Sequence, residues 1–505
     1  MVKKMLIIGW DGAPFKLINN LIKENNLPNL NKIIKNGFFG QLETVPYVMS
    51  SCAWSTMVTG KNAGKHGIFD FYSNEFNGDS YFRNPISAIN REEKEVWKYL
   101  SKRDIKIGLI NIPMTYPAKK VNGYMVAGML TPKVNSKYFT YPDDLLNNYK
   151  GLQNYIIDIV KTQNMTYDDL LNDVYKMIES RTDLILYLIK NHKNVDLLFA
   201  VYTAPDRISH FFWHFYDKSH PYIKNESSKD IQKFKNVIAD IYKKLDEELG
   251  IIIKTFKKYV SNDFSIMVLS DHGISSLKKI VHINKILNKK GYLKFKPKKD
   301  WIELKKDILD SKVSYIYGKI DWLETKAYSI GKRGAIYINL KGREPYGIIE
   351  KNDYEKIIKQ IKEDFTNLKD PSIGNKIVKN IKSRDELFFG KNIEKAPDIL
   401  IYLYNGYFPF GYAIDIDKPN IISINDDKYL YFVTGIESGD GILCIYDKRV
   451  KSNSTYDESK IIDITPTLMY MLNLSIPIDI DGRVLTEIFK NCYLIKHPIK
   501  YVNIN

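Results

Sequence analysis

The sequence predicts an α/β fold in which a mainly parallel central sheet is flanked by helices. Along the 505 residues, short apolar runs alternate with longer stretches of helical periodicity, and this alternation is typical of βα units. Hydrophobic residues make up 44% of the chain and aromatic residues 13%, which is enough to build a sizeable core. The sequence contains no internal repeat and no low-complexity linker.

Six short apolar runs are the candidate strands of the buried sheet. They cover residues 5–9, 105–110, 196–202, 265–270, 398–402 and 441–446. Two of the predicted helices cover residues 167–190 and 228–257. Apolar side chains of the second helix recur at helical spacing beside charged residues, and we expect them to pack in the core: Ile231, Phe234, Val237, Ile238 and Ile241.

The least regular stretch covers residues 278–394. It contains lysine-rich segments, a strand predicted at 336–340 and a helix predicted near 353–367. No run of Pro, Gly or Ser marks it as a separate domain. We therefore expect one domain over residues 1–505, with an insertion or cap at about 278–394.

The composition excludes several classes of protein. The net charge is +16, but the lysines are spread along the chain and no RNP, helix-turn-helix or zinc-finger pattern occurs, so we expect attraction for small anionic substrates and no specific nucleic-acid binding. Three cysteines are too few for a disulfide framework or a thiolate zinc site. The sequence contains no run of about 18 uncharged apolar residues, so we expect no membrane-spanning helix. The first apolar run is too short for a signal peptide, so we expect a cytoplasmic protein that does not bind membranes.

Acidic residues and histidines follow three of the predicted strands. Asp11 follows the first run, Asp206 and His210 follow the run at 196–202, and Asp271-His272 follow the run at 265–270. Taken singly, each acid could be a helix cap, and Asp206 and His210 could simply share a hydrogen bond. Together they occupy the carboxyl ends of parallel strands, where ligands bind in such sheets. Carboxylates and imidazoles that converge from separate strands are typical of hydrolytic metal pairs.

A candidate nucleophile lies in the segment VMSSCAWSTMVTGKNAGKHG, which covers residues 48–67. Small and hydroxyl residues there precede a predicted helix. A serine at a helix N-terminus has backbone N–H groups and the helix dipole available for a phosphoryl anion. By itself the segment is equally consistent with an ordinary serine cap.

Taken together, these motifs resemble the alkaline phosphatase superfamily, specifically its type I phosphodiesterase/nucleotide pyrophosphatase branch. The resemblance runs through GWDG, SSCAW, KHGIFDF, NIPMTYP, PDRISHFFW, LSDHG, APDIL and DITPTLMYMLNL to DGRVL, in the family's order over nearly the whole chain. It implies an alkaline-phosphatase-like core and hydrolysis of phosphate esters. It also implies two divalent metal ions, zinc or manganese, with magnesium possible.

The resemblance also implies roles for individual residues. Ser50 takes the position of the nucleophile, with Cys52 in place of the proline of the family pattern, and Ser51 stays a weaker candidate. The implied ligands of one metal are Asp11, Ser50, Asp271 and His272. The implied ligands of the other are Asp206 and His210, with Glu437 in a third position.

Two positions depart from the family pattern. Glu437 stands where a histidine is usual, which makes the second site harder and more anionic and favours manganese or magnesium over zinc; alternatively, that site is weak or empty. The additional negative charge also predicts a preference for monoanionic diesters over dianionic monoesters. Phe71 occupies the position of an oxyanion-binding Asn, which argues against assuming a nucleotide substrate. His66 is not in a ligand position and is expected to be structural.

The predicted reaction is hydrolysis of a phosphoester, with a diester as the expected substrate, through a covalent intermediate on Ser50. The alternatives are a phosphomonoesterase or phosphotransferase, and a non-catalytic binding protein of the same fold. The expected partner is a small anionic phosphoester. The sequence determines neither the physiological substrate nor the oligomeric state.

Overall fold

The central sheet has nine strands in the part of the chain that is described, which comprises residues 4–77, 80–162, 164–297, 319–411, 420–424 and 433–503 of the computed structural model. At its centre β1 (Lys4–Trp10) pairs in parallel with β8 (Leu197–Tyr202) and with β9 (Phe264–Leu269). All residues of β8 and β9 are buried, as expected for parallel strands that are covered on both faces. The predicted mainly parallel sheet is therefore confirmed.

The sheet extends on both sides of this centre. Beyond β8, β5 (Ile107–Ile110) and β6 (Gly123–Val126) continue in parallel, and β7 (Thr140–Tyr141) closes the edge in the antiparallel direction. Beyond β9 lie β18 (Asp440–Tyr446), β2 (Phe38–Glu43) and β19 (Ser459–Lys460). β18 is antiparallel to both of its neighbours, so the strand predicted at 441–446 forms but runs against the parallel set.

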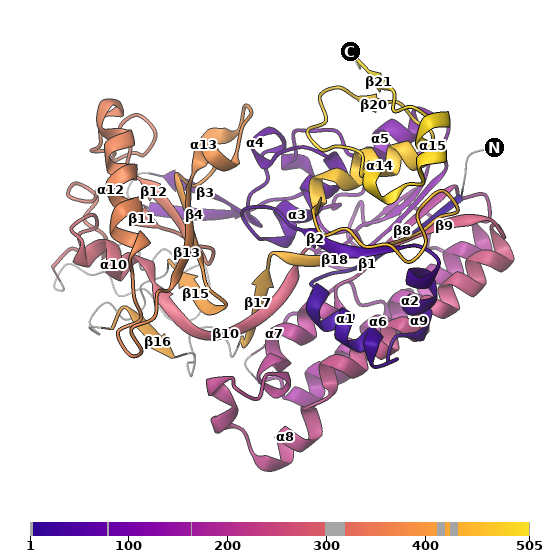
Figure 1. Ribbon diagram of the computed structural model, residues 1–505, viewed down its shortest axis with the longest axis horizontal. Helices are drawn as coiled ribbons and strands as arrows, with labels where there is room; N and C mark the ends of the chain where they lie inside the picture. The colour runs from indigo at the N-terminus through magenta and orange to yellow at the C-terminus, as the bar shows by residue number, and fades with distance from the viewer. Residues whose placement is uncertain are drawn as a thin grey trace.

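Helices cover both faces of the sheet (Figure 1). Side chains of β1 alternate between two cores, because successive residues of a strand point to opposite faces: Leu6 and Ile8 face one core, and Met5 and Ile7 face the other. The first core is covered by α1 (Phe15–Lys23), α2 (Pro28–Lys35), α6 (Tyr167–Asn191), α7 (Ala204–Tyr216), α8 (Ser228–Phe234) and α9 (Val237–Tyr259). The second is covered by α3 (Ser50–Thr59), α5 (Val96–Ser101), α14 (Ile464–Met471) and α15 (Asn491–Lys496).

Two predicted elements differ from the structure. The helix predicted at 228–257 is divided into α8 and α9 by a turn at Lys235 and Asn236. Apolar side chains of both helices are buried, so the apolar periodicity of the sequence continues across the turn and does not reveal it. The strand predicted at 398–402 forms as β14 (Ile399–Leu403), but it belongs to a smaller sheet outside the central one. An apolar run predicts a strand without specifying its partners.

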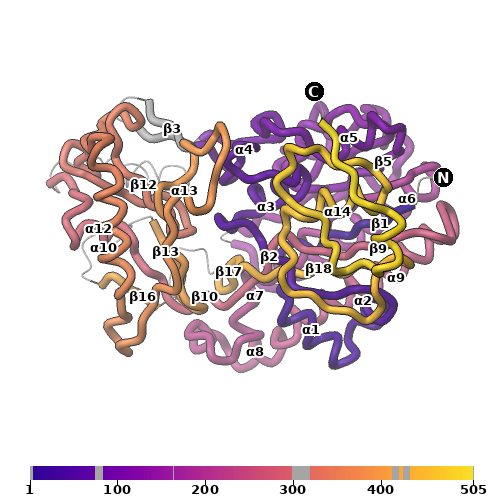
Figure 2. Tube along the Cα trace, turned by 45° about the horizontal axis from the view of Figure 1, so that its top comes forward, coloured from indigo at the N-terminus to yellow at the C-terminus, as the bar shows by residue number. Residues whose placement is uncertain are grey.

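The smaller sheets form a second part of the molecule, on the left in Figures 1 and 2. The long strand β10 (Gly273–His282) leads into it, pairing first with β17 (Gly435–Ser438) and then with β15 (Gly406–Phe410) and β16 (Ile422–Ile424). A further sheet contains β11 (Ala327–Ser329), β12 (Ala335–Ile338), β14 and β13 (Val378–Ser383). With α10 (Ile283–Lys289) and α12 (Tyr354–Thr366), these strands enclose a separate apolar core.

The remaining elements are short: β3 (Tyr72–Asn77), β4 (Ser80–Pro85), α4 (Ala63–His66), α13 (Arg384–Leu387), β20 (Ile476–Pro477) and β21 (Tyr501–Val502). The limits of an insertion at 278–394 within one domain stay a prediction. Among the described residues, no helix combines the length and the apolar character that a membrane span needs.

Candidate active site

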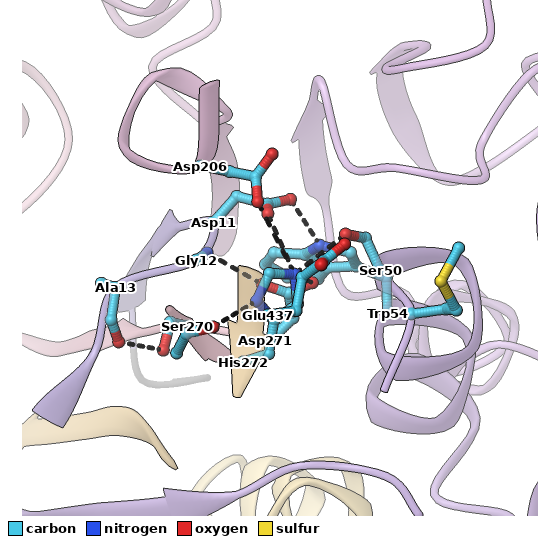
Figure 3. A network of polar contacts seen from close by, with 12 residues as sticks. Asp11, Gly12, Ala13, Ser50, Trp54, Asp206, Ser270, Asp271, His272 and Glu437 are labelled. Atoms are coloured by element: carbon cyan, nitrogen blue, oxygen red, sulfur yellow. Dashed lines mark hydrogen bonds and ion pairs between the residues drawn. The ribbon is translucent and has the colours of Figure 1, made fainter. Parts of the chain in front are cut away.

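The candidate site lies at the carboxyl ends of β1, β9 and β8 (Figure 3). Asp11 directly follows β1, Asp271 and His272 connect β9 to β10, and Asp206 lies in the first turn of α7, just after β8. Parallel strands bring these ends to one edge of the sheet. Ser50 reaches the same place as the first residue of α3.

His272 contacts the candidate nucleophile. Its Nε2 lies 3.0 Å from Ser50 Oγ, and its Nδ1–H donates to the Gly273 carbonyl at 2.9 Å. In the neutral ring, Nε2 therefore carries the lone pair and accepts from the Ser50 hydroxyl. The same Nε2 lies 3.4 Å from Asp271 Oδ2 and 3.7 Å from Asp11 Oδ1. Ser51, the weaker candidate, is fully buried and its Oγ has no hydrogen-bond partner among the described residues.

Each of the three carboxylates around His272 accepts a hydrogen bond from the protein through one of its two oxygens. Trp54 Nε1 donates to Asp11 Oδ2 at 2.9 Å, and the Gly12 N–H donates to Asp271 Oδ1 at 3.2 Å. Arg207 donates to Asp206 Oδ2 at 2.5 Å. The other oxygen of Asp11 and that of Asp271 are buried and have no hydrogen-bond partner in the described part of the chain. Asp206 Oδ1 is also buried and lies 3.2 Å from His210 Nε2. Buried polar atoms normally have partners, so this pattern points to a cation.

The pKa values of these acids reflect the crowding of negative charge. Burial, together with repulsion from the neighbouring carboxylates, raises the pKa of Asp11 and that of Asp271 well above the usual range. Burial also acts to raise the pKa of Asp206, but His210 and Arg207 outweigh it and hold that pKa below its usual value. One donor atom each of Asp11, Asp206 and His272 lies within 4.8 Å of the others, and such a cluster of oxygen and nitrogen donors suits a divalent metal.

His210 and Glu437 form the adjoining part of the site. The Nδ1–H of His210 donates to the Gly435 carbonyl at 2.8 Å, so Nε2 faces Asp206 Oδ1 at 3.2 Å and Glu437 Oε1 at 3.9 Å. Burial would lower the pKa of His210, but the carboxylates of Asp206 and Glu437 outweigh it and raise that pKa to about 9. Glu437 lies on β17 opposite Ile274 of β10, and it points toward the site.

Two arginines of the site were not predicted. Arg207 is held between Asp206 and Asp158, and Arg333, from the loop before β12, forms an ion pair with Glu437 Oε1. Burial would raise the pKa of Glu437, but Arg333 and then His210 lower it to about 2. The additional negative charge that the sequence predicted from Glu437 is therefore compensated by Arg333. The available signals were weak: Arg207 follows Asp206 directly, and Arg333 lies between Gly331 and Gly334, whose φ angles are +80° and +70°.

A cleft of about 670 Å³ opens between the central sheet and the smaller sheets. Its lining includes Thr44 and Glu437 from the edge of the site, with Arg333, Lys379 and Tyr402 from the smaller sheets. Its volume is typical of a small-molecule site.

His66 and Phe71 lie outside this arrangement. His66 is buried, with Nε2 2.9 Å from Thr56 Oγ1 and Nδ1 accepting from the Ile68 N–H at 3.1 Å. Burial and the nearby Arg91 lower its pKa to about 3, which suits a structural neutral histidine. Phe71 packs against a small apolar cluster of Ile68, Ile86 and Met114.

Comparison with known proteins identifies the family. The family model of type I phosphodiesterase/nucleotide pyrophosphatase matches residues 5–420. The chain belongs to this family. The resemblance in the sequence motifs is thereby confirmed, and family membership supports phosphoester hydrolysis.

Two solved structures of ectonucleotide pyrophosphatase/phosphodiesterase 5 share the fold. An inactive form of murine ectonucleotide pyrophosphatase/phosphodiesterase 5, in complex with AMP, has a TM-score of 0.50 at 14% identity, with 94% of this chain and 96% of the other covered. The human ectonucleotide pyrophosphatase/phosphodiesterase 5 gives the same values. No curated protein sequence matches the chain. At this identity the structures establish the alkaline-phosphatase-like core and nothing finer.

Proposed function

We propose that this protein hydrolyses phosphodiesters in a metal-dependent reaction with Ser50 as the nucleophile. The observation that carries the proposal is the contact between Ser50 Oγ and His272 Nε2 at 3.0 Å, in a pocket where Asp11 and Asp271 each have one buried oxygen without a hydrogen-bond partner among the described residues. A hydroxyl is a weak nucleophile until a metal or a base activates it.

The residues present fit two divalent cations. In the proposed assignment, Asp11, Ser50, Asp271 and His272 hold one, and Asp206, His210 and Glu437 hold the other. Both histidines donate Nδ1–H to a backbone carbonyl and turn Nε2 inward, which is the usual support of a metal-binding imidazole. Donor atoms of Asp11, Asp206 and His272 lie close together, so the two sets adjoin. A carboxylate at Glu437 in place of an imidazole favours manganese over zinc, with magnesium possible.

The protein's own groups determine the course of the reaction. When bound, divalent ions supply the positive charge that lowers the pKa of the Ser50 hydroxyl and offsets charge on the phosphoryl oxygens. Ser50 is the first residue of α3, and the backbone N–H groups and dipole of a helix N-terminus favour a phosphoryl anion at that position. Ser50 Oγ loses its proton and forms a bond to phosphorus, while the bond between phosphorus and the ester oxygen opposite breaks and that oxygen leaves with a proton as the alcohol. A diester substrate thereby gives a phosphodiester on Ser50, and a monoester would give phosphoserine. Water then attacks from the side of the leaving group and releases Ser50.

The test is a panel of aryl phosphate mono- and diesters. The protein is freed of metal with a chelator and then assayed with zinc, manganese or magnesium. We expect metal-dependent hydrolysis, with diesters preferred and manganese at least as effective as zinc. Hydrolysis of monoesters alone would replace the proposal with a phosphomonoesterase. Metal binding without turnover of any ester would favour a non-catalytic binding protein.

A further inference from the structure

Arg333 brings a positive charge from the smaller sheets to the edge of the candidate site. The residue belongs to the loop between β11 and β12, far in sequence from the site residues of the central sheet. Its Nη2 forms an ion pair with Glu437 Oε1, and its Nε lies 3.1 Å from the Sδ of Met49, the residue directly before Ser50. The guanidinium therefore lies between Glu437 and the N-terminus of α3.

The side chain of Arg333 is only 10% exposed. A guanidinium has five N–H donors in a planar fork. Glu437 engages one nitrogen, and the thioether of Met49 is a weak acceptor. Nη1 has no hydrogen-bond partner among the residues that the structure describes. A largely buried arginine, in contact with the residue that precedes the candidate nucleophile, thus retains donors without a partner among the described residues. Arg333 also lines the cleft.

The chemistry of a guanidinium matches a phosphoryl group, which offers oxygens at the spacing of the fork. We propose that Arg333 binds a non-bridging oxygen of the substrate's phosphoryl group, so that the smaller sheets supply part of the active site. Glu437 is then a positioning residue for Arg333, because its Oε1 holds the guanidinium while its other oxygen, Oε2, remains unpartnered among the described residues. This inference rests on the proposed function of the site.

The competing explanation is that Arg333 only neutralises Glu437. The two explanations differ when both residues are changed. Because Glu437 is also a proposed metal ligand, the double variant is compared with Glu437→Gln. If neutralisation is the whole role, removal of Arg333 from Glu437→Gln should leave phosphate binding unchanged, because Gln carries no charge to neutralise. If Arg333 binds phosphate, the double variant should bind phosphate more weakly than Glu437→Gln does.

The experiment measures binding of inorganic phosphate by calorimetry to the metal-loaded protein, beside kcat and KM for an aryl diester. Loss of a charge-assisted hydrogen bond should weaken phosphate binding about 10- to 100-fold in Arg333→Ala, with unchanged metal content. Arg333→Lys should recover part of the loss, and added guanidinium should partly restore turnover of Arg333→Ala. Lys341→Ala is the matched control, since it removes a cation that pairs with Glu350 on the exposed surface of the same part of the molecule.

Three results would overturn the inference: phosphate affinity that is unchanged in Arg333→Ala, phosphate affinity that is the same in the double variant as in Glu437→Gln, or failure of guanidinium to restore turnover. Each is distinct from failure of the proposed function, which would appear as absence of metal-dependent diester hydrolysis in the unmodified protein. Phosphate binding can still be compared between the two proteins in that case.

Discussion

Asp11→Asn should make the metal-free protein more stable, although it replaces a fully buried side chain. The variant retains an oxygen that can accept from Trp54 Nε1 but loses one negative charge from the cluster. Donor oxygens of Asp11 and Asp206 lie within 4.8 Å of each other. At that distance two unit charges repel by about 3.5 kcal/mol with an effective dielectric constant of about 20. Because Arg207 offsets part of the charge on Asp206, we expect a gain of about 2 kcal/mol.

The gain can be measured as a shift of the melting temperature in chelator. An unfolding entropy of about 2.1 cal/mol/K per residue gives roughly 1 kcal/mol/K for a chain of this length, so Tm should rise by about 2 °C. The pKa of Asp11 is raised in the folded state, so its carboxylate destabilises the fold at pH values above the unfolded pKa. The gain should therefore be largest near pH 8 and should decline as the pH approaches that unfolded value.

Metal should reverse the order of stability. Manganese or zinc at 100 times its dissociation constant stabilises a protein that binds it by about 2.7 kcal/mol, and Asp11→Asn should lose much of this gain. Asp246→Asn is the matched control: this buried carboxylate accepts from the N–H groups of Asn29 and Leu30, so its removal should lower Tm. A lower Tm for Asp11→Asn in chelator, together with an unchanged response to metal, would refute the reasoning.

Three further outcomes are expected. Ser50→Ala should lower kcat by several orders of magnitude with unchanged metal content, whereas Ser51→Ala should stay active; the reverse result in steady-state assays would move the nucleophile by one residue. The pKa of His210 is raised to about 9 without metal, so a metal that binds below that pH must displace a proton from His210. The affinity of the protein for the metal, measured by competition with a chelator, should therefore fall as the pH falls from about 9. An affinity that does not change with pH would exclude His210 as a ligand. Glu437→His should shift activation from manganese toward zinc and raise the ratio of kcat/KM for monoesters to kcat/KM for diesters. An unchanged ratio would show that Glu437 does not determine the preference for substrate charge.

Much of the sheet and of the site could be predicted from the sequence, because both depend on local signals. Continuous apolar runs predicted β1, β8 and β9, and the acids and histidines directly after them were brought to one edge by the parallel arrangement. Partners across the molecule carry no such signal. The sequence could not show that β14 joins a smaller sheet, or that Arg333 reaches Glu437 from a segment that appeared irregular. The charge of the second site depends on that long-range contact.

The roles of individual site residues require chemistry beyond the fold. The structure brings Ser50, Asp11, Asp271 and His272 together and sets His210 and Glu437 beside Asp206. A fold that is shared at 14% identity does not establish that two proteins catalyse the same reaction. The nucleophile, the metals and the substrate therefore stay proposals that the experiments above address.

The central claim is a double displacement through Ser50, and stereochemistry at phosphorus tests it most directly. A diester that is chiral at phosphorus through sulfur and oxygen-isotope labels is hydrolysed by the metal-loaded protein, and the configuration of the product is determined by phosphorus NMR. Two successive in-line displacements, first by Ser50 Oγ and then by water, predict net retention. Net inversion would show that water attacks the substrate directly, and it would contradict a covalent intermediate on Ser50.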